Sequence, residues 1–290
     1  MERKHRIYHS GAGFFAWLLG SVLHYRDKEV MINLSRSFPD KKYKELKQIH
    51  KQFYRHFGEI IAEALWFGRN CRGNRGCKRL HRSHIVEMTN PEVLNRLFRE
   101  NLQVMAMESH TGNWELIGGF FNYNYSDEPL AMSPEHIAVT YNRLHSARWD
   151  RFMAKNRCAP LTQTKFAGYC ESREILRYAV QHRRDPHVYV FITDQYPYKF
   201  ATKHHLGQFM HQDTETMNGA AVLACKMNMA VVYLRFARRE GGGYAITFIP
   251  IAEHAGDSTP EAIMEQYYKL LEEDINAQPW NYLWSHKRWK

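Results

Sequence analysis

Cysteine is scarce in this chain, with only five in 290 residues. The five are scattered, at Cys71, Cys77, Cys158, Cys170 and Cys225. An odd and scattered set is not the disulfide framework of a small secreted protein, so a reducing, cytoplasmic environment is predicted. Cys71 and Cys77 precede His81 and His84, but their spacing is not a usual one for zinc ligands. We therefore interpret residues 69–82 as a basic loop and predict no metal site.

The sequence also lacks an obvious membrane-spanning segment. Residues 11–23 are uncharged and apolar, whereas a spanning helix needs about 20 such residues. No A-x-A-like cleavage site follows, which argues against a removed signal peptide. The pattern predicts a helix lying in the bilayer interface, with Trp17 among the lipids and the basic residues 1–6 at the headgroups. An ordinary buried helix fits the same residues.

Several well-known functional motifs are absent. There is no Walker loop and no G-x-G-x-x-G, so neither a phosphate-binding loop nor a dinucleotide-binding turn is predicted. There is no G-x-S-x-G elbow, the mark of many serine hydrolases. We also find no internal repeat and no RNP, helix-turn-helix or zinc-finger pattern. The sequence therefore predicts no cofactor.

Positive charge and apolar residues are abundant. Lys and Arg together number 40 against 30 Asp and Glu, a net charge of +10. Hydrophobic residues make up 44% and aromatic residues 14% of the chain, which is typical of a folded protein and favours apolar binding surfaces. On charge alone, the partner is anionic: a nucleic acid, phospholipid headgroups, a phosphorylated lipid or an acidic carrier protein.

The first third of the chain has the periodicity of helices. In residues 41–67, apolar side chains recur at three- and four-residue spacing, which predicts one long helix. Residues 90–92, Asn-Pro-Glu, are a typical cap, first-turn proline and first-turn acid of a further short helix. The same reasoning predicts a last helix over residues 261–277.

Short apolar runs follow this helical region. Most are separated by stretches of helical length, which is typical of a parallel sheet with helices on its faces. A glycine turn leads into residues 241–249, predicted as an antiparallel edge strand. The predicted fold is α/β, with a mostly parallel central sheet, flanking helices and a helical N-terminal region. Residues 1–24 are predicted as the membrane-interface segment and residues 25–290 as a single domain. The four parallel runs are residues 104–107, 138–141, 187–192 and 230–236.

His110 and Glu115 lie where the first of these strands ends and a helix begins. In open α/β sheets, ligands bind at the carboxyl ends of the strands. The turn at Gly112 and Asn113 can bring the carboxylate onto the imidazole, fixing its tautomer and leaving the other ring nitrogen free to take a proton from a hydroxyl. Two other histidine–carboxylate pairs have the same spacing: His24 with Glu29 and His145 with Asp150. The spacing alone is therefore not specific, and the prediction rests on the strand-turn-helix context, which only His110 and Glu115 have. A structural histidine is the alternative.

The stretch His110-Thr-Gly-Asn-Trp-Glu115 resembles the H-x4-[DE] signature of the lysophospholipid acyltransferase superfamily. More narrowly, it resembles the His-x-Gly-Asn-Trp-Glu form of the bacterial lipid A biosynthesis acyltransferases of the late lauroyl/myristoyl type. Other segments resemble the same family in the same order and cover nearly the whole chain. They are Arg26 with residues 33–39 (NLSRSFP), residues 54–58 (YRHFG) with Glu63, residues 192–197 (ITDQYP), residues 209–214 (FMHQDT) with Gly219, and residues 283–290 (LWSHKRWK).

This resemblance implies a glycerophosphate-acyltransferase-like fold and direct acyl transfer, without a covalent enzyme intermediate. His110, oriented by Glu115, would deprotonate an acceptor hydroxyl, which attacks the thioester of an acyl carrier protein or, as the alternative, of acyl-CoA. The implied acceptor is a glycolipid, a lipid A precursor. The implied location is the cytoplasmic face of the inner membrane, with peripheral or short-anchored attachment to the membrane surface.

The oxyanion of the tetrahedral intermediate needs positive charge or N–H donors. Arg143, Arg157 and the backbone N–H groups of Gly112-Asn113 are the candidates, and the sequence leaves the choice between the two arginines open. Asp194 follows the third strand, where contacts to the acceptor headgroup and hydrogen bonds that order the loop both fit. We interpret Asp213-Thr214 as the cap of a helix.

Other interpretations remain for the tail and for the function. Trp280, Trp284 and Trp289 suit a membrane-interface belt or a tail docked on the domain.

The catalytic pair of His110 and Glu115 would equally serve a lysophospholipid or an amino-lipid acceptor. The alternative to an enzyme is a basic nucleic-acid- or membrane-associated binding protein without catalysis. An acidic carrier, anionic lipid and a phosphorylated glycolipid already explain the basic excess, so no nucleic-acid partner is predicted.

Overall fold

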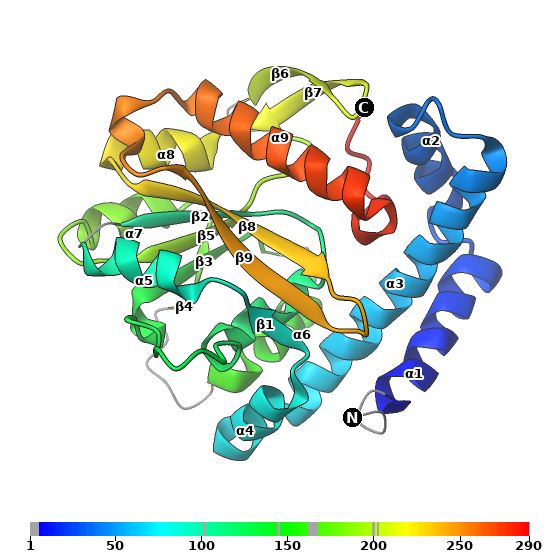
Figure 1. The fold of residues 1–290 in the computed structure, drawn as a ribbon, viewed down its shortest axis with the longest axis horizontal. Helices are drawn as coiled ribbons and strands as arrows, with labels where there is room; N and C mark the ends of the chain where they lie inside the picture. The colour runs from blue at the N-terminus through cyan, green and yellow to red at the C-terminus, as the bar shows by residue number, and fades with distance from the viewer. Residues whose placement is uncertain are drawn as a thin grey trace.

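The computed structural model describes residues 6–100, 103–143, 146–161, 168–198, 201 and 203–289. Within these residues the strands form a seven-stranded sheet, in the order β1-β9-β8-β2-β5-β3-β4, and a separate hairpin of β6 and β7 (Figure 1). Only β8 and β9 pair antiparallel in the described large sheet, which confirms the predicted α/β fold with a mostly parallel sheet. The large sheet comprises β1 (Val86–Met88), β2 (Val104–Glu108), β3 (Ile137–Tyr141), β4 (Gly168–Glu171), β5 (Val188–Ile192), β8 (Ala230–Arg238) and β9 (Tyr244–Ala252). Residues 1–5 of the predicted basic start (residues 1–6), together with His145 and Lys290, lie outside the described residues.

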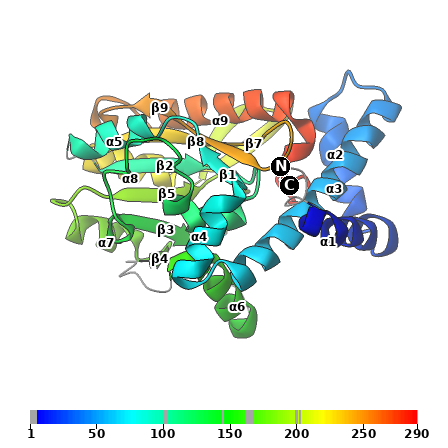
Figure 2. The same cartoon turned by 60° about the horizontal axis from the view of Figure 1, so that its bottom comes forward.

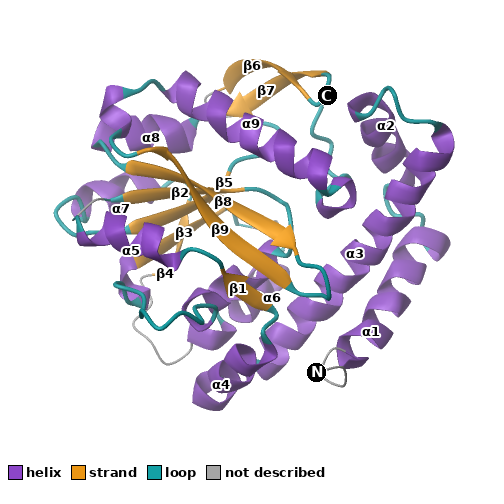
Figure 3. Ribbon diagram, viewed as in Figure 1, coloured by secondary structure: helices purple, strands orange, loops and turns teal. Residues whose placement is uncertain are grey.

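Helices cover both faces of the sheet (Figure 3). Successive side chains of a strand point to opposite faces, and β2 places Met105 and Met107 in one core but Val104 and Ala106 in the other. One core includes residues of α7, α8 and α9, and the other includes residues of α4 and α5. These helices are α4 (Gly73–Ser83), α5 (Pro91–Arg99), α7 (Ile175–Gln181), α8 (Gly219–Met227) and α9 (Pro260–Ala277).

The predicted helical region precedes the sheet. It comprises α1 (Arg6–Trp17), a π-helical turn (Leu18–Val22), α2 (Asp27–Ser37) and α3 (Tyr43–Asn70). The backbone N–H of Lys42 donates to the Glu45 carboxylate at 2.9 Å and caps the start of α3. α3 buries Phe53 and Phe67 in the two cores, and α1 packs along it outside the sheet (Figure 2). α3 therefore links the N-terminal region to both layers of the domain.

The prediction of a basic loop over residues 69–82 is wrong, because most of this segment forms α4. Leu80 is fully buried and gives the segment an apolar side. Gly76 packs directly against the backbone of Cys71, where a Cβ atom would clash. The Gly- and Arg-rich composition does not indicate a helix, because only one large apolar side chain of the segment is buried against the domain.

Two further local predictions are wrong. Residues 241–249 do not form an edge strand, because the short strand β1 pairs in parallel with the outer side of β9. Asp213 and Thr214 do not cap a helix but lie in β7 (Gln212–Met217), which pairs with β6 (Lys203–Phe209). Asp213 contacts His205 across this hairpin at 2.8 Å.

The C-terminal tail is docked on the domain. Trp284 is fully buried, with its ring 5.8 Å from that of Phe38. Arg288 is also buried and donates to the hydroxyl of Tyr268 at 2.9 Å, and the Trp289 indole N–H donates to Thr214. The docked tail is thus the correct alternative for Trp284 and Trp289, and the membrane belt is not.

Candidate active site

The candidate site lies at the carboxyl ends of β2 and β5, which are parallel neighbours. Their last registered pair is Glu108 with Ile192, so His110 and Asp194, each two residues further on, meet beyond the sheet. The Asp194 Oδ1 atom accepts hydrogen bonds from the His110 backbone N–H at 3.2 Å and from the ring Nδ1 at 2.8 Å. Because an ionised carboxylate only accepts, Nδ1 carries a ring proton, and in the neutral imidazole Nε2 therefore carries a lone pair.

The Asp194 carboxylate is ionised although its side chain is only 2% exposed. Burial by itself would raise the pKa of Asp194, but the electrostatic attraction to the His110 ring in its protonated form and the two hydrogen bonds from His110 hold this pKa below the usual value. Burial and the nearby Asp194 together raise the pKa of the Tyr282 phenol well above its usual value, so Tyr282 stays neutral. A buried carboxylate in this position would stabilise an imidazolium at His110.

Glu115 does not occupy the place that the sequence predicted for it. It lies in the first turn of the 3₁₀ helix η2 (Trp114–Asn122), and its two oxygens accept hydrogen bonds from Arg157 Nε at 2.7 Å and Nη2 at 2.6 Å. The predicted contact with the imidazole is made by Asp194 instead. The bidentate geometry is the strongest form of an arginine–carboxylate pair and fixes the guanidinium group of Arg157 beside the turn between His110 and Glu115.

Arg143 and Arg157, the two candidates for stabilising the oxyanion, lie in different surroundings. Arg157 ends α6 (Ala147–Arg157), which is held to α3 by a hydrogen bond from the Asn156 amide to the Ala64 carbonyl at 2.9 Å. Arg143 is 68% exposed and pairs at 3.0 Å with Glu171 of β4, two strands away from β5. The structure brings Arg157, and not Arg143, to Glu115.

The turn between His110 and Glu115 is fixed by α3. Gly112 has φ +63°, and a Cβ atom there would meet the backbone and ring of Phe236, so glycine is required. Its carbonyl accepts from the His56 ring at 3.2 Å. Burial lowers the pKa of His56, which keeps this histidine neutral. The Asn113 amide donates to Glu63 at 2.8 Å.

Two groups of this turn that were predicted to contact the substrate already have hydrogen-bond partners within the protein. The Asn113 side chain is fully buried and bonded to Glu63, so it holds the turn and does not reach a ligand. The Gly112 backbone N–H already donates to the carbonyl of Asn281 at 3.2 Å. Gly112 is therefore not an available oxyanion donor in this arrangement.

Glu108 adds a third carboxyl group below the site. Its side chain is fully buried, and neither oxygen has a hydrogen-bond partner among the described residues. Burial, followed by the charges of Asp194 and Glu115, raises the pKa of Glu108 well above its usual value, which favours its neutral form. The charged groups of the site are thus Asp194, Glu115 and Arg157.

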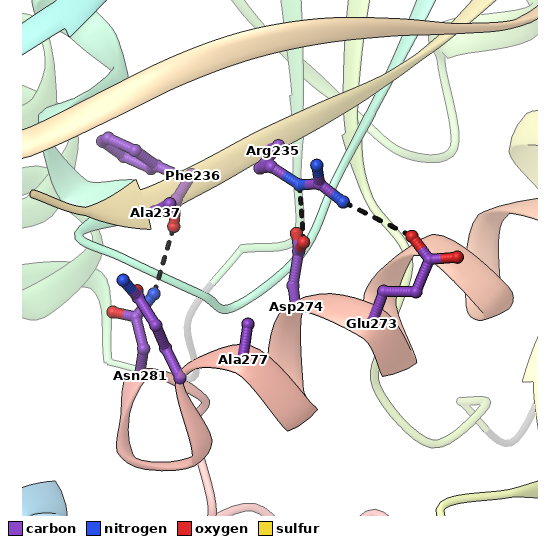
Figure 4. A pocket seen from close by; sticks show the side chains of 8 residues that line it. Arg235, Phe236, Ala237, Glu273, Asp274, Ala277 and Asn281 are labelled. Atoms are coloured by element: carbon purple, nitrogen blue, oxygen red, sulfur yellow. Dashed lines mark hydrogen bonds and ion pairs between the residues drawn. The ribbon is translucent and has the colours of Figure 1, made fainter.

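A cavity of about 280 Å³ lies between β8 and the end of α9 (Figure 4). Its wall carries Arg235, which pairs with Asp274 at 2.5 Å and with Glu273 at 3.7 Å. Charged walls do not suit an acyl chain, which needs apolar side chains around it. Asn281, also on the wall, accepts a hydrogen bond from the Gly112 backbone N–H, so this cavity adjoins the turn between His110 and Glu115.

Sequence reasoning missed the partners of the histidine. Asp194 was a candidate without a defined role, and Gln195, whose Nε2 lies 3.0 Å from His110 Nε2, was not singled out. The available signal was a polar Asp-Gln pair directly after a predicted buried strand, at the edge where the strand of His110 also ends. Only the strand order shows that the two strands are neighbours.

The fold and the site together define an α/β enzyme in which a histidine, held by a buried carboxylate at the ends of parallel strands, is placed to accept a proton. The chain belongs to a family described as bacterial lipid A biosynthesis acyltransferase, whose model matches residues 5–290. It is therefore an acyltransferase. No curated protein matches the chain in sequence.

Proposed function

We propose that this enzyme moves a fatty acyl group from the thioester of an acyl carrier protein to a hydroxyl of a lipid A precursor, at the cytoplasmic face of the inner membrane. The observation that supports this mechanism is the His110–Asp194 pair, with Nδ1 and Oδ1 2.8 Å apart. The pair orients the imidazole so that its second nitrogen can act as a general base.

In the proposed reaction, the acceptor hydroxyl gives its proton to His110 Nε2 as its oxygen attacks the thioester carbon. The tetrahedral intermediate then collapses, the carbon–sulfur bond breaks, and the imidazolium returns the proton to the leaving thiolate. Asp194 stabilises the imidazolium between these two steps. Arg157, held by both oxygens of Glu115, is the cation that we assign to the developing oxyanion.

A cationic helix packed on η2 supports an acidic acyl donor. α4 packs against η2, the element that carries Glu115. Its exposed cations face no acidic residue within the helix itself, and positive patches attract acidic protein surfaces. The exposed side chains are Arg72, just before the helix, and Arg75, Lys78, Arg79 and Arg82.

The activity is tested with the detergent-purified protein and radiolabelled acyl donors. We expect transfer from acyl carrier protein thioesters to a lipid A precursor, and slower transfer from acyl-CoA. A lysophospholipid and an amino-lipid are offered as competing acceptors. Faster acylation of either one would overturn the proposed acceptor, and equal use of both donors would overturn the assignment of the carrier protein.

Exposed aromatic side chains support contact with a membrane surface. No helix in the described ranges combines the length and the apolar character needed to cross a bilayer. α1 packs on α3 but leaves Phe14 and Trp17 54% and 56% exposed. α6, also packed on α3, exposes Trp149 and Phe152 among the exposed cations Arg148, Arg151 and Lys155. Aromatic rings interleaved with cations are typical of an interfacial surface.

We expect the double variant Trp17→Ser/Trp149→Ser to bind anionic phospholipid vesicles at least about fivefold more weakly than the native chain, because two interfacial aromatic anchors are lost. Co-flotation with the vesicles measures this binding. Tyr43→Ser is the matched control, since Tyr43 is 67% exposed but lies at the start of α3. Equal binding by the double variant and the native chain would show that these helices do not contact the lipid.

A further inference from the structure

Gln195 occupies the position from which an acceptor hydroxyl would approach the base. Its amide Nε2 lies 3.0 Å from His110 Nε2. Because His110 Nδ1 is bonded to Asp194, the Nε2 lone pair is the acceptor, and the Gln195 amide N–H is the donor. The same lone pair must accept the hydroxyl proton during the reaction, so Gln195 and the acceptor compete for one site.

The rest of the imidazole is also covered. The His110 side chain is only 14% exposed. The ring of Trp114 lies edge-on at 4.9 Å between centroids, and Asp194 closes the Nδ1 side. With Gln195 in place, none of the hydrogen-bonding positions of the ring is left for a water molecule.

A thioester can also react with water, and this side reaction would use the same base. Water would give one proton to His110 Nε2, its oxygen would attack the thioester carbon, and the carbon–sulfur bond would break to give a fatty acid and a thiol. An acyltransferase must keep this hydrolysis slow when the acyl donor is bound and no acceptor is present.

We propose that Gln195 shields the catalytic base in the absence of an acceptor and thereby makes the enzyme a transferase and not a thioesterase. This proposal rests on the proposed function. A water molecule that displaces Gln195 exchanges one hydrogen bond for another and gains little. An acceptor lipid also makes contacts away from the reacting hydroxyl, and these can drive the displacement.

The shape-matched variant Gln195→Met keeps the length of the side chain but removes the N–H donor, and Gln195→Ala removes the whole amide. We expect both variants to release free fatty acid from the acyl donor, without acceptor, about tenfold faster than the native enzyme, since one hydrogen bond no longer protects the base. The ratio of hydrolysis to transfer at saturating acceptor is therefore expected to rise in both variants.

The measurement is the ratio of fatty acid released to acyl lipid formed, with the same labelled donor for every variant. Gln208→Ala, which removes an exposed glutamine of the β6–β7 hairpin, is the control and should keep the native ratio. A fall in transfer with no rise in hydrolysis, or no change in either rate, would overturn the shielding role. Native enzyme that forms no acyl lipid would instead refute the proposed function, so the two failures are distinct.

Discussion

His110→Ala is expected to lower the rate of acyl transfer at least about 100-fold, because it removes the group that takes the acceptor proton. Asp194→Asn is expected to cause a loss of similar size. An asparagine amide can present its NH₂ group to Nδ1, which would then lose its proton to Nε2 and leave no lone pair for the acceptor. The measurement is kcat at saturating donor and acceptor, with equal amounts of folded protein.

A second histidine–aspartate pair provides a matched control. His50 Nε2 lies 2.7 Å from Asp27 Oδ1, and the His50 side chain is 11% exposed, close to the exposure of His110. This pair joins α3 to α2, away from the strand ends. We expect His50→Ala and Asp27→Asn to change kcat by less than about twofold once folding is matched. If His110→Ala keeps more than about a tenth of native activity, the base is another group.

The regular elements of the fold could be predicted from the sequence because their apolar patterns are long. The apolar residues of α3 and the buried runs of β2, β5 and β8 have the periods of a helix and of buried strands. The elements that escaped prediction have short patterns. β1 spans only Val86–Met88, and α4 relies on Leu80 for its buried side. Their conformation depends on what they pack against.

The site was predictable only in part for a related reason. The position of His110 at a strand end follows from the local sequence, whereas its partner depends on which strand lies beside β2. Asp194 follows His110 by 84 positions, and no local pattern indicates that the two strands are adjacent. Spacing alone favoured Glu115 as the partner. Arg157, 42 positions further on, binds both oxygens of that carboxylate instead.

Arg157→Met is expected to lower kcat about 100-fold, the usual effect of removing one donor to an oxyanion. Arg157→Lys keeps the charge but loses the two parallel hydrogen bonds to Glu115, so we expect partial recovery of activity. Arg143→Met is the control, because Arg143 is 68% exposed and pairs with Glu171 in a separate arginine–glutamate contact. A loss in Arg143→Met as large as in Arg157→Met would assign the oxyanion to the other arginine.

Loss of folding is separated from loss of catalysis by a double variant. Arg157→Met leaves the Glu115 carboxylate, only 11% exposed, without its cation, which destabilises the fold. Adding Glu115→Gln removes that unpaired charge, so we expect the thermal midpoint to return toward the native value while kcat stays low. If activity returns together with stability, Arg157 serves only to neutralise Glu115, and the positive charge for the oxyanion must come from another group.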